Sequence, residues 1–78
     1  MLNLEYNAEH GYFVWKRGRL KNEIAGSGRK LKLHGNLYPQ EKLAIFYMTG
    51  SWPKDTIVFI DGDEYNIAYK NLKLKNAP

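Results

Sequence analysis

The pattern of apolar and polar positions along the chain predicts several short strands before a helix. Lys30-Leu31-Lys32-Leu33 alternates polar and apolar side chains, the two-residue period of a half-buried strand. Tyr12-Phe13-Val14-Trp15 is a compact run of residues that favour strands. Together with Leu37-Tyr38, which follow the turn residues Gly35-Asn36, these segments predict a meander of short antiparallel strands.

The strongest helix signal spans residues 40–49. Pro39 suits the first position of a helix, and Gly50 suits its end. The expected apolar face is formed by Leu43, Phe46 and Tyr47, spaced i, i+3 and i+4, and is widened by Ala44 and Ile45.

The last third of the chain predicts one clear strand. Residues 56–60 form the most strand-like run, and Asp61-Gly62-Asp63 predicts a sharp turn directly after it. Residues 65–69 fit either one helical turn or an irregular path, and residues 72–75 fit either a short exposed strand or a tail. No internal repeat is visible, so we expect one α+β domain over residues 1–78, with short antiparallel strands and one main helix.

Composition narrows the chemistry that this domain can use. The chain has 78 residues and no cysteine, which excludes disulfides, zinc sites with thiolate ligands and cysteine nucleophiles. It has no apolar run close to the roughly 18 residues that a membrane span needs. We therefore expect a soluble, cytoplasmic protein without a membrane partner.

The net charge of +4 conceals two segments of opposite sign. Residues 16–32 carry +6 and residues 55–64 carry −4. The glycine-rich basic segment predicts a loop or hairpin that binds the phosphates of nucleic acid, most simply DNA, although a merely solvated hairpin has the same composition. Tyr12 or Trp15 is available to stack on bases, but its strand position favours a core role for Trp15. The expected phosphate-binding residues are Lys16, Arg17, Arg19, Lys21, Arg29, Lys30 and Lys32.

Local motifs indicate neither a catalytic nor a metal site. His10 and His34 are separated by 24 residues, and the glycine after each predicts a turn rather than a zinc ligand. Residues 61–64 lack the spacing of a calcium loop, and no phosphate-binding glycine motif is present. From these motifs alone we expect no metal, no cofactor and no enzymatic activity.

The order of residues nevertheless resembles the small HNH homing-type endonucleases of bacteriophages. Met48 to Pro53, followed by a β run and an acid–glycine turn, is the most specific part of this resemblance. The other matching positions are Tyr6, Gly11, Phe13, Trp15, Lys16, Ala25, Gly26, Tyr38, Leu43, Ala44, Ile57, Ile60, Gly62, Asp63, Asn71 and Leu72. The resemblance implies a ββα-metal type scaffold in a phage protein of the host cytoplasm.

The resemblance also implies that catalysis has been lost. Val58 and Phe59 occupy the positions of the family's Asp-His pair, in which the acid binds a divalent metal and the histidine activates water. Asn71 lies twelve residues after Phe59, at the position of the asparagine that orients that histidine, and the closing ligand would fall beyond Pro78. Two further departures are Glu41-Lys42 in place of a His-Arg pair and residues 66–68 in place of an arginine-bearing stretch. We expect a degenerate scaffold without its metal, that is, a pseudo-nuclease.

Two functions follow from this interpretation. The first is nucleic-acid binding through the basic hairpin by an inactive HNH-like phage protein. The second is inhibition of a host protein, such as a CRISPR effector, another defence protein or a nuclease bound to its nucleic acid, because opposed charge patches suit a protein partner. The residues expected at that protein interface are Asp61, Asp63, Glu64, Tyr65 and Tyr69.

Overall fold

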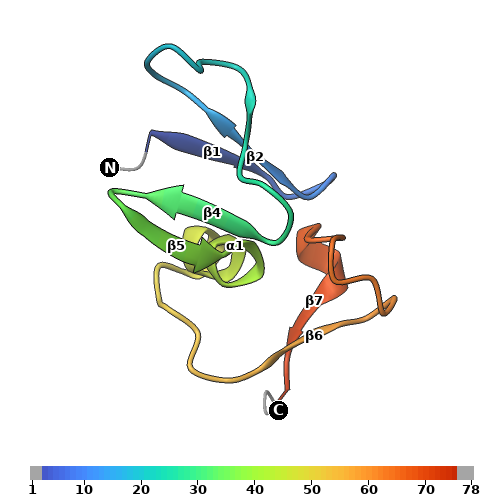
Figure 1. Cartoon of the computed structure of the whole chain (residues 1–78). Helices are drawn as coiled ribbons and strands as arrows, with labels where there is room; N and C mark the ends of the chain where they lie inside the picture. Colours follow the sequence, from blue (N-terminus) through green and yellow to red (C-terminus); the bar gives the residue numbers. More distant parts are fainter. Residues whose placement is uncertain (1–2, 76–78) are drawn as a thin grey trace.

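The computed structural model of the chain describes residues 3–75, so residues 1–2 and 76–78 of the expected domain lie outside the described part. The described residues form a small α+β fold of seven short antiparallel strands and one α-helix, which confirms the expected class (Figure 1). The elements in chain order are β1 Leu4–Asn7, β2 Tyr12–Trp15, β3 Ile24–Ala25, β4 Lys30–Leu33, β5 Asn36–Pro39, α1 Gln40–Thr49, β6 Ile57–Phe59, a 3₁₀ turn η1 Tyr69–Asn71 and β7 Leu72–Leu74.

The strands divide into three small sheets rather than one meander. β1, β2 and β3 form one sheet, while β4–β5 and β6–β7 are separate antiparallel pairs. The predicted single meander is therefore wrong, because Phe13 of β2 pairs with Tyr6 of β1 on one side and Ala25 of β3 on the other. Neither side of β2 is free for β4. β1 and β3 were not predicted from the sequence.

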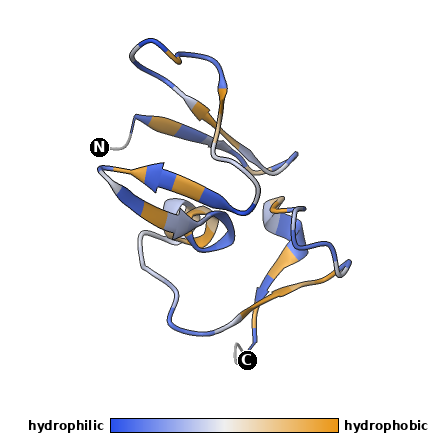
Figure 2. Ribbon diagram, viewed as in Figure 1, coloured by the Kyte–Doolittle hydropathy of each residue, from blue (hydrophilic) through white to orange (hydrophobic). Residues whose placement is uncertain are grey.

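Alternation along the strands determines which side chains are buried. Leu31 and Leu33 of β4 are buried while Lys30 and Lys32 are exposed, as predicted, and this alternation is visible in Figure 2. Phe59 and Leu72 of the β6–β7 pair are half-buried and pack against the same core. The buried residues of that core are Leu4, Tyr6, Phe13, Ala25, Leu31, Leu33, Leu43, Ala44 and Ile67.

Helix α1 lies close to its predicted bounds. It begins at Gln40 because Pro39 is still extended, with ψ 130°, and it ends at Thr49 because the next residue, Gly50, has a left-handed φ of 80°. The N–H of Gly50 donates to the carbonyl of Phe46 at 2.8 Å. No helix within residues 3–75 combines the length and apolar character needed to cross a bilayer.

The apolar face of α1 is rotated from the predicted one. Leu43, Ala44 and Ile45 are buried, whereas Phe46 is only half-buried and Tyr47 is 41% exposed. The prediction of Tyr47 as a buried position is therefore wrong. The ring of Tyr47 instead covers the outer side of the core, 5.9 Å from the ring of Tyr6.

A close backbone crossing joins the N-terminal sheet to the C-terminal part of the chain. Gly11 has a φ of 79°, and a Cβ atom at this position would lie 2.3 Å from the backbone nitrogen of Ala68. Next to this crossing, the hydroxyl of Tyr6 donates a hydrogen bond to the carbonyl of Ile67. Only glycine fits here, because the left-handed φ and the neighbouring backbone both exclude a side chain.

Candidate nucleic-acid interface

The best-defined basic surface is the loop of residues 16–22 between β2 and β3, here called the basic loop. Its ends are fixed by two backbone hydrogen bonds, from Trp15 N–H to the Glu23 carbonyl at 3.0 Å and from Asn22 N–H to the Trp15 carbonyl at 2.8 Å. Two overlapping turns follow, closed by Lys21 N–H to Gly18 O at 3.2 Å and by Glu23 N–H to Leu20 O at 2.9 Å. The backbone of the basic loop is thus held in one path before any ligand binds.

Three cations of this loop have uncompensated charge. Arg17, Arg19 and Lys21 are exposed, and none of the ion pairs found among residues 3–75 includes them. Lys16 lies 4.0 Å from a carboxylate oxygen of Glu5, in an exposed pair of little energetic consequence. The basic loop therefore concentrates positive charge on a fixed backbone, the combination that phosphate binding requires.

The loop also borders an apolar surface. Trp15, Arg17, Arg19 and Leu20 line an open pocket of about 380 Å³. Trp15 is half-buried: part of its side chain packs against the core, as its strand position favoured, and part borders this pocket. Leu20 is 52% exposed and was not singled out from the sequence. Its one available signal was its place as an apolar residue among charged neighbours.

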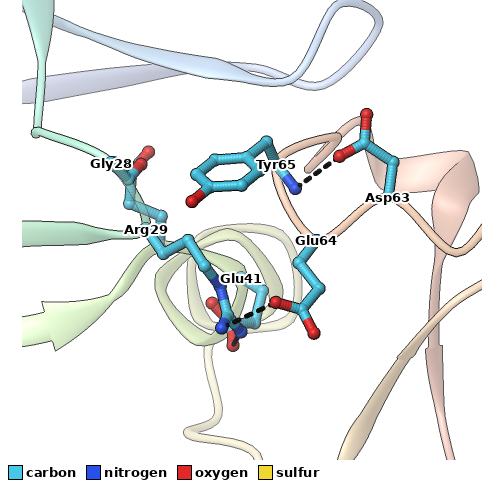
Figure 3. Close-up of polar contacts among 7 residues, drawn as sticks. Gly28, Arg29, Glu41, Asp63, Glu64 and Tyr65 are labelled. Carbon is cyan, nitrogen blue, oxygen red and sulfur yellow. Dashed lines mark hydrogen bonds and ion pairs between the residues drawn. The ribbon is translucent and has the colours of Figure 1, made fainter.

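Arg29 does not belong to this free basic surface. Its guanidinium lies 2.9 Å from a carboxylate oxygen of Glu64 and 3.5 Å from one of Glu41 (Figure 3). Two carboxylates face one guanidinium, so its charge is fully compensated within the fold. Of the predicted phosphate-binding residues, Arg29 is thus ion-paired in the structure, where it joins the loop before β4 to α1 and to the turn after β6.

Lys30 and Lys32 lie on a different sheet from the basic loop. Both occupy exposed positions of β4, whose partner strand is β5 and not β3. The seven expected phosphate-binding residues therefore fall into three groups: the basic loop with Lys16, the exposed face of β4, and the ion-paired Arg29. A run of charge along the sequence does not reveal this division.

Gln40 is a further positioning residue that the sequence did not reveal. Its side chain is buried, and its Nε2 atom donates to the carbonyls of Gly28 at 3.2 Å and Lys30 at 3.1 Å. Its backbone N–H donates to the carbonyl of Arg29 at 2.9 Å. Gln40 thus fixes the loop that carries Arg29 to the first turn of α1, and nothing in the local pattern distinguishes it from a solvated polar residue.

Val58 and Phe59, the residues at the expected catalytic positions, lie in different surroundings. Val58 is 40% exposed and pairs with Lys73, so it adds nothing to the core, because the pleat turns it away from the face that Phe59 occupies. Phe59 lines a polar pocket of about 380 Å³ near the start of α1. Within residues 3–75 no cluster of three or more histidine, aspartate or glutamate side chains could hold a metal ion.

Asn71 organises the turn after β6, residues 61–66, here called the acidic turn. Its Oδ1 accepts from the N–H of Asp61 at 2.8 Å, and its Nδ2 donates to Asp61 Oδ1 and to the carbonyl of Asn66, each at 2.9 Å. The buried Asn71 therefore satisfies three polar groups of the turn. The side chain has a structural role that does not involve a neighbouring histidine.

The acidic turn is further fixed by its own carboxylates. Asp61 accepts from the N–H of Asp63 at 2.8 Å, and Asp63 accepts from the N–H of Tyr65 at 2.9 Å. A hydrogen bond donated by the Asn66 side chain is the largest cause that lowers the pKa of Asp61. Tyr65 is 68% exposed, and its ring points toward the loop at Gly28 (Figure 3).

The other predicted interface residues differ in their exposure and in whether they form ion pairs. Tyr69 is 38% exposed, and Asp63 is exposed at the tip of the turn. Glu64 is ion-paired with Arg29, so one of the three predicted acidic interface residues already has a partner within the fold.

Comparison of the chain with protein-family models, with curated proteins and with solved structures found no match.

Proposed function

We propose that this chain is a catalytically inactive, HNH-like phage protein that binds nucleic acid through the basic loop. The observation that supports this most directly is the set of three unpaired cations, Arg17, Arg19 and Lys21, on a loop whose backbone hydrogen bonds fix its shape. Phosphate chains pair with such cations and release bound counterions, which stabilises the complex at low salt.

The absence of catalysis in this proposal is supported by the residues at the expected catalytic positions. Neither Val58 nor Phe59 can ligate a metal ion or accept a proton, and the polar atoms of Asn71 are engaged in hydrogen bonds with its own turn. An inactive protein should not nick supercoiled plasmid with Mg²⁺ or Mn²⁺. Nicking that increases with protein and stops with EDTA would contradict this part of the proposal and leave the binding part intact.

Binding itself is tested by titrating a fluorescent duplex at increasing salt. Neutralisation of about three phosphates gives a slope of log K against log salt near −2.7, so affinity should fall about 40-fold between 50 and 200 mM salt. The triple variant Arg17→Ala, Arg19→Ala, Lys21→Ala should lose most of both the affinity and the slope.

The matched control removes three exposed cations from the C-terminal part, in Lys70→Ala, Lys73→Ala, Lys75→Ala. Both triple variants lower the net charge by the same amount, so only the location of the charge differs. Wild-type affinity in this control supports the basic loop as the site. Equal losses in the two variants would mean that binding reflects net charge alone, and no binding at low salt would refute the proposal.

A second candidate, inhibition of a host protein, is favoured by the acidic turn. This turn is ordered by side-chain hydrogen bonds and presents an exposed Tyr65, and rigid exposed tyrosines are common anchors of protein interfaces. Pull-down from nuclease-treated host lysate separates the two candidates. A stoichiometric partner that is lost with Tyr65→Ala supports inhibition, whereas loss of all bound material after nuclease treatment supports nucleic-acid binding.

A further inference from the structure

The open pocket beside the basic loop has the chemistry of a site for a flat aromatic group attached to an anionic chain. Trp15 and Leu20 supply apolar surface, and Arg17 and Arg19 line the same pocket with uncompensated positive charge. Its volume of about 380 Å³ lies within the range of about 300 to 1,000 Å³ that is typical of small-ligand sites. The apolar surface alone would fit many ligands, but the two guanidiniums select an anion.

Trp15 can contact a ligand in the pocket while it keeps its contacts with the core. Trp15 pairs with Leu4 in the β1–β2 ladder, and part of its side chain packs against the core. The rest of the side chain borders the pocket. An indole fixed in this way loses little conformational freedom when an aromatic ring packs against it.

The surface of a base that this pocket can contact indicates whether the nucleic acid is single-stranded or duplex. The bases of a duplex are stacked and present only their edges in the grooves. An apolar surface next to an indole contacts the face of a base, which is available only when the base is unpaired. Arginine beside it either pairs with the adjoining phosphate or stacks on the base.

We propose that the Trp15–Leu20 pocket binds an unpaired nucleobase, with Arg17 and Arg19 on the adjoining phosphates, so that the chain prefers single-stranded nucleic acid. This inference rests on the proposed function and goes beyond it by naming the class of nucleic acid. It also assigns Leu20, an exposed leucine in a charged loop, a role in binding.

The decisive probe is a pair of oligonucleotides with equal charge. A twelve-nucleotide thymidine oligonucleotide and its abasic analogue carry the same phosphates, so they differ only in the bases. Stacking of one base should make the thymidine oligonucleotide bind about 5- to 140-fold more tightly than the abasic chain. It should also bind more tightly than a duplex of twelve base pairs, and a twelve-nucleotide uridine oligonucleotide shows whether DNA or RNA is preferred.

Two variants locate the contact without changing charge. Leu20→Ala should remove most of the preference for bases, whereas Ile24→Ala should retain it, because Ile24 is 64% exposed on β3 but does not line the pocket. In Trp52→Phe, Trp15 is the sole tryptophan, and its fluorescence should be quenched by the thymidine oligonucleotide but not by the abasic one. This readout does not require substitution of Trp15, whose loss would disturb the core.

The outcomes distinguish this inference from the proposed function. Equal affinity for the thymidine and abasic chains, or tighter binding of the duplex, overturns the base pocket and leaves phosphate binding through the basic loop in place. Failure of every oligonucleotide to bind at low salt overturns both. Equally tight binding of an acidic, tyrosine-containing peptide of the same charge overturns the base pocket in favour of a protein ligand.

Discussion

Substitution of Gly11 by alanine tests whether the crossing with the C-terminal segment stabilises the fold. Gly11 and Gly62 have nearly identical φ angles, 79° and 78°. A Cβ at Gly62 meets nothing within 4 Å, whereas a Cβ at Gly11 would lie 2.3 Å from the nitrogen of Ala68 and 2.7 Å from the carbonyl carbon of Ile67. The two alanine variants therefore share the backbone strain and differ only in the steric contact.

The expected magnitudes follow from this difference. Left-handed φ costs an alanine about 1 to 2 kcal/mol, and the reduced freedom of the unfolded chain returns about 0.4 to 1 kcal/mol, so Gly62→Ala should cost about 1 kcal/mol. In Gly11→Ala the backbone at 67–68 must also move. Two hydrogen bonds are then strained, from Tyr6 to Ile67 and from Tyr69 N–H to the Ala8 carbonyl. At about 1 to 3 kcal/mol each, they add about 2 to 6 kcal/mol.

Urea unfolding followed by tryptophan fluorescence measures this difference. A chain of this length has a total stability of about 4 to 12 kcal/mol, so Gly11→Ala should be largely unfolded or have a much lower midpoint. An additional 2 kcal/mol relative to Gly62→Ala corresponds to a midpoint lower by about 1 to 2 M urea. If both variants unfold at the same midpoint, the crossing contributes no stability and the reasoning is refuted.

Three further predictions concern polar groups inside the fold. Burial is the larger cause that raises the pKa of Tyr6 to about 12. The folded state therefore favours the neutral phenol, and the stability that Tyr6 contributes is intact below pH 10 and lost between pH 10 and 12. In urea melts, the difference in stability between wild type and Tyr6→Phe should narrow over that range. Asn66→Ala removes the hydrogen bond that lowers the pKa of Asp61, so an NMR titration should show that pKa moving up toward its usual value; an unchanged pKa would contradict the assigned cause. Gln40→Glu, which lacks the amide donor, should destabilise the protein by about 1 to 3 kcal/mol in thermal unfolding, as should Gln40→Ala, and wild-type stability in Gln40→Glu would show that the amide contacts are dispensable.

Local rules explain why part of this fold was predictable. β2, β4, β6 and α1 were all expected, because their signals lie within a few consecutive residues: alternation at Lys30 to Leu33, a run of β-favouring residues, and a glycine at the end of the helix. Of the two alternatives that the local pattern left open, residues 65–68 follow an irregular path, with the 3₁₀ turn after them at Tyr69–Asn71, and Leu72–Leu74 form a strand. Pairing of the strands was predicted less well, because it depends on contacts between distant residues.

Prediction of the candidate site from sequence was limited in the same way, by contacts between distant residues. The sequence alone determined that residues 16–32 carry most of the positive charge and that the chain has no cysteine. Only the tertiary structure decided which cations are free, because Arg29 meets Glu41 and Glu64 from elements that follow it in the chain.

The pocket, too, depends on the fold. Turn hydrogen bonds bring Leu20 back toward the strand that ends at Trp15, so that both line one cavity with Arg17 and Arg19. Charge and composition are properties of the chain. Ion pairing such as that of Arg29 with Glu64 depends on distances between residues far apart in the sequence, and these distances are set when the apolar surfaces of the strands and α1 pack into one core.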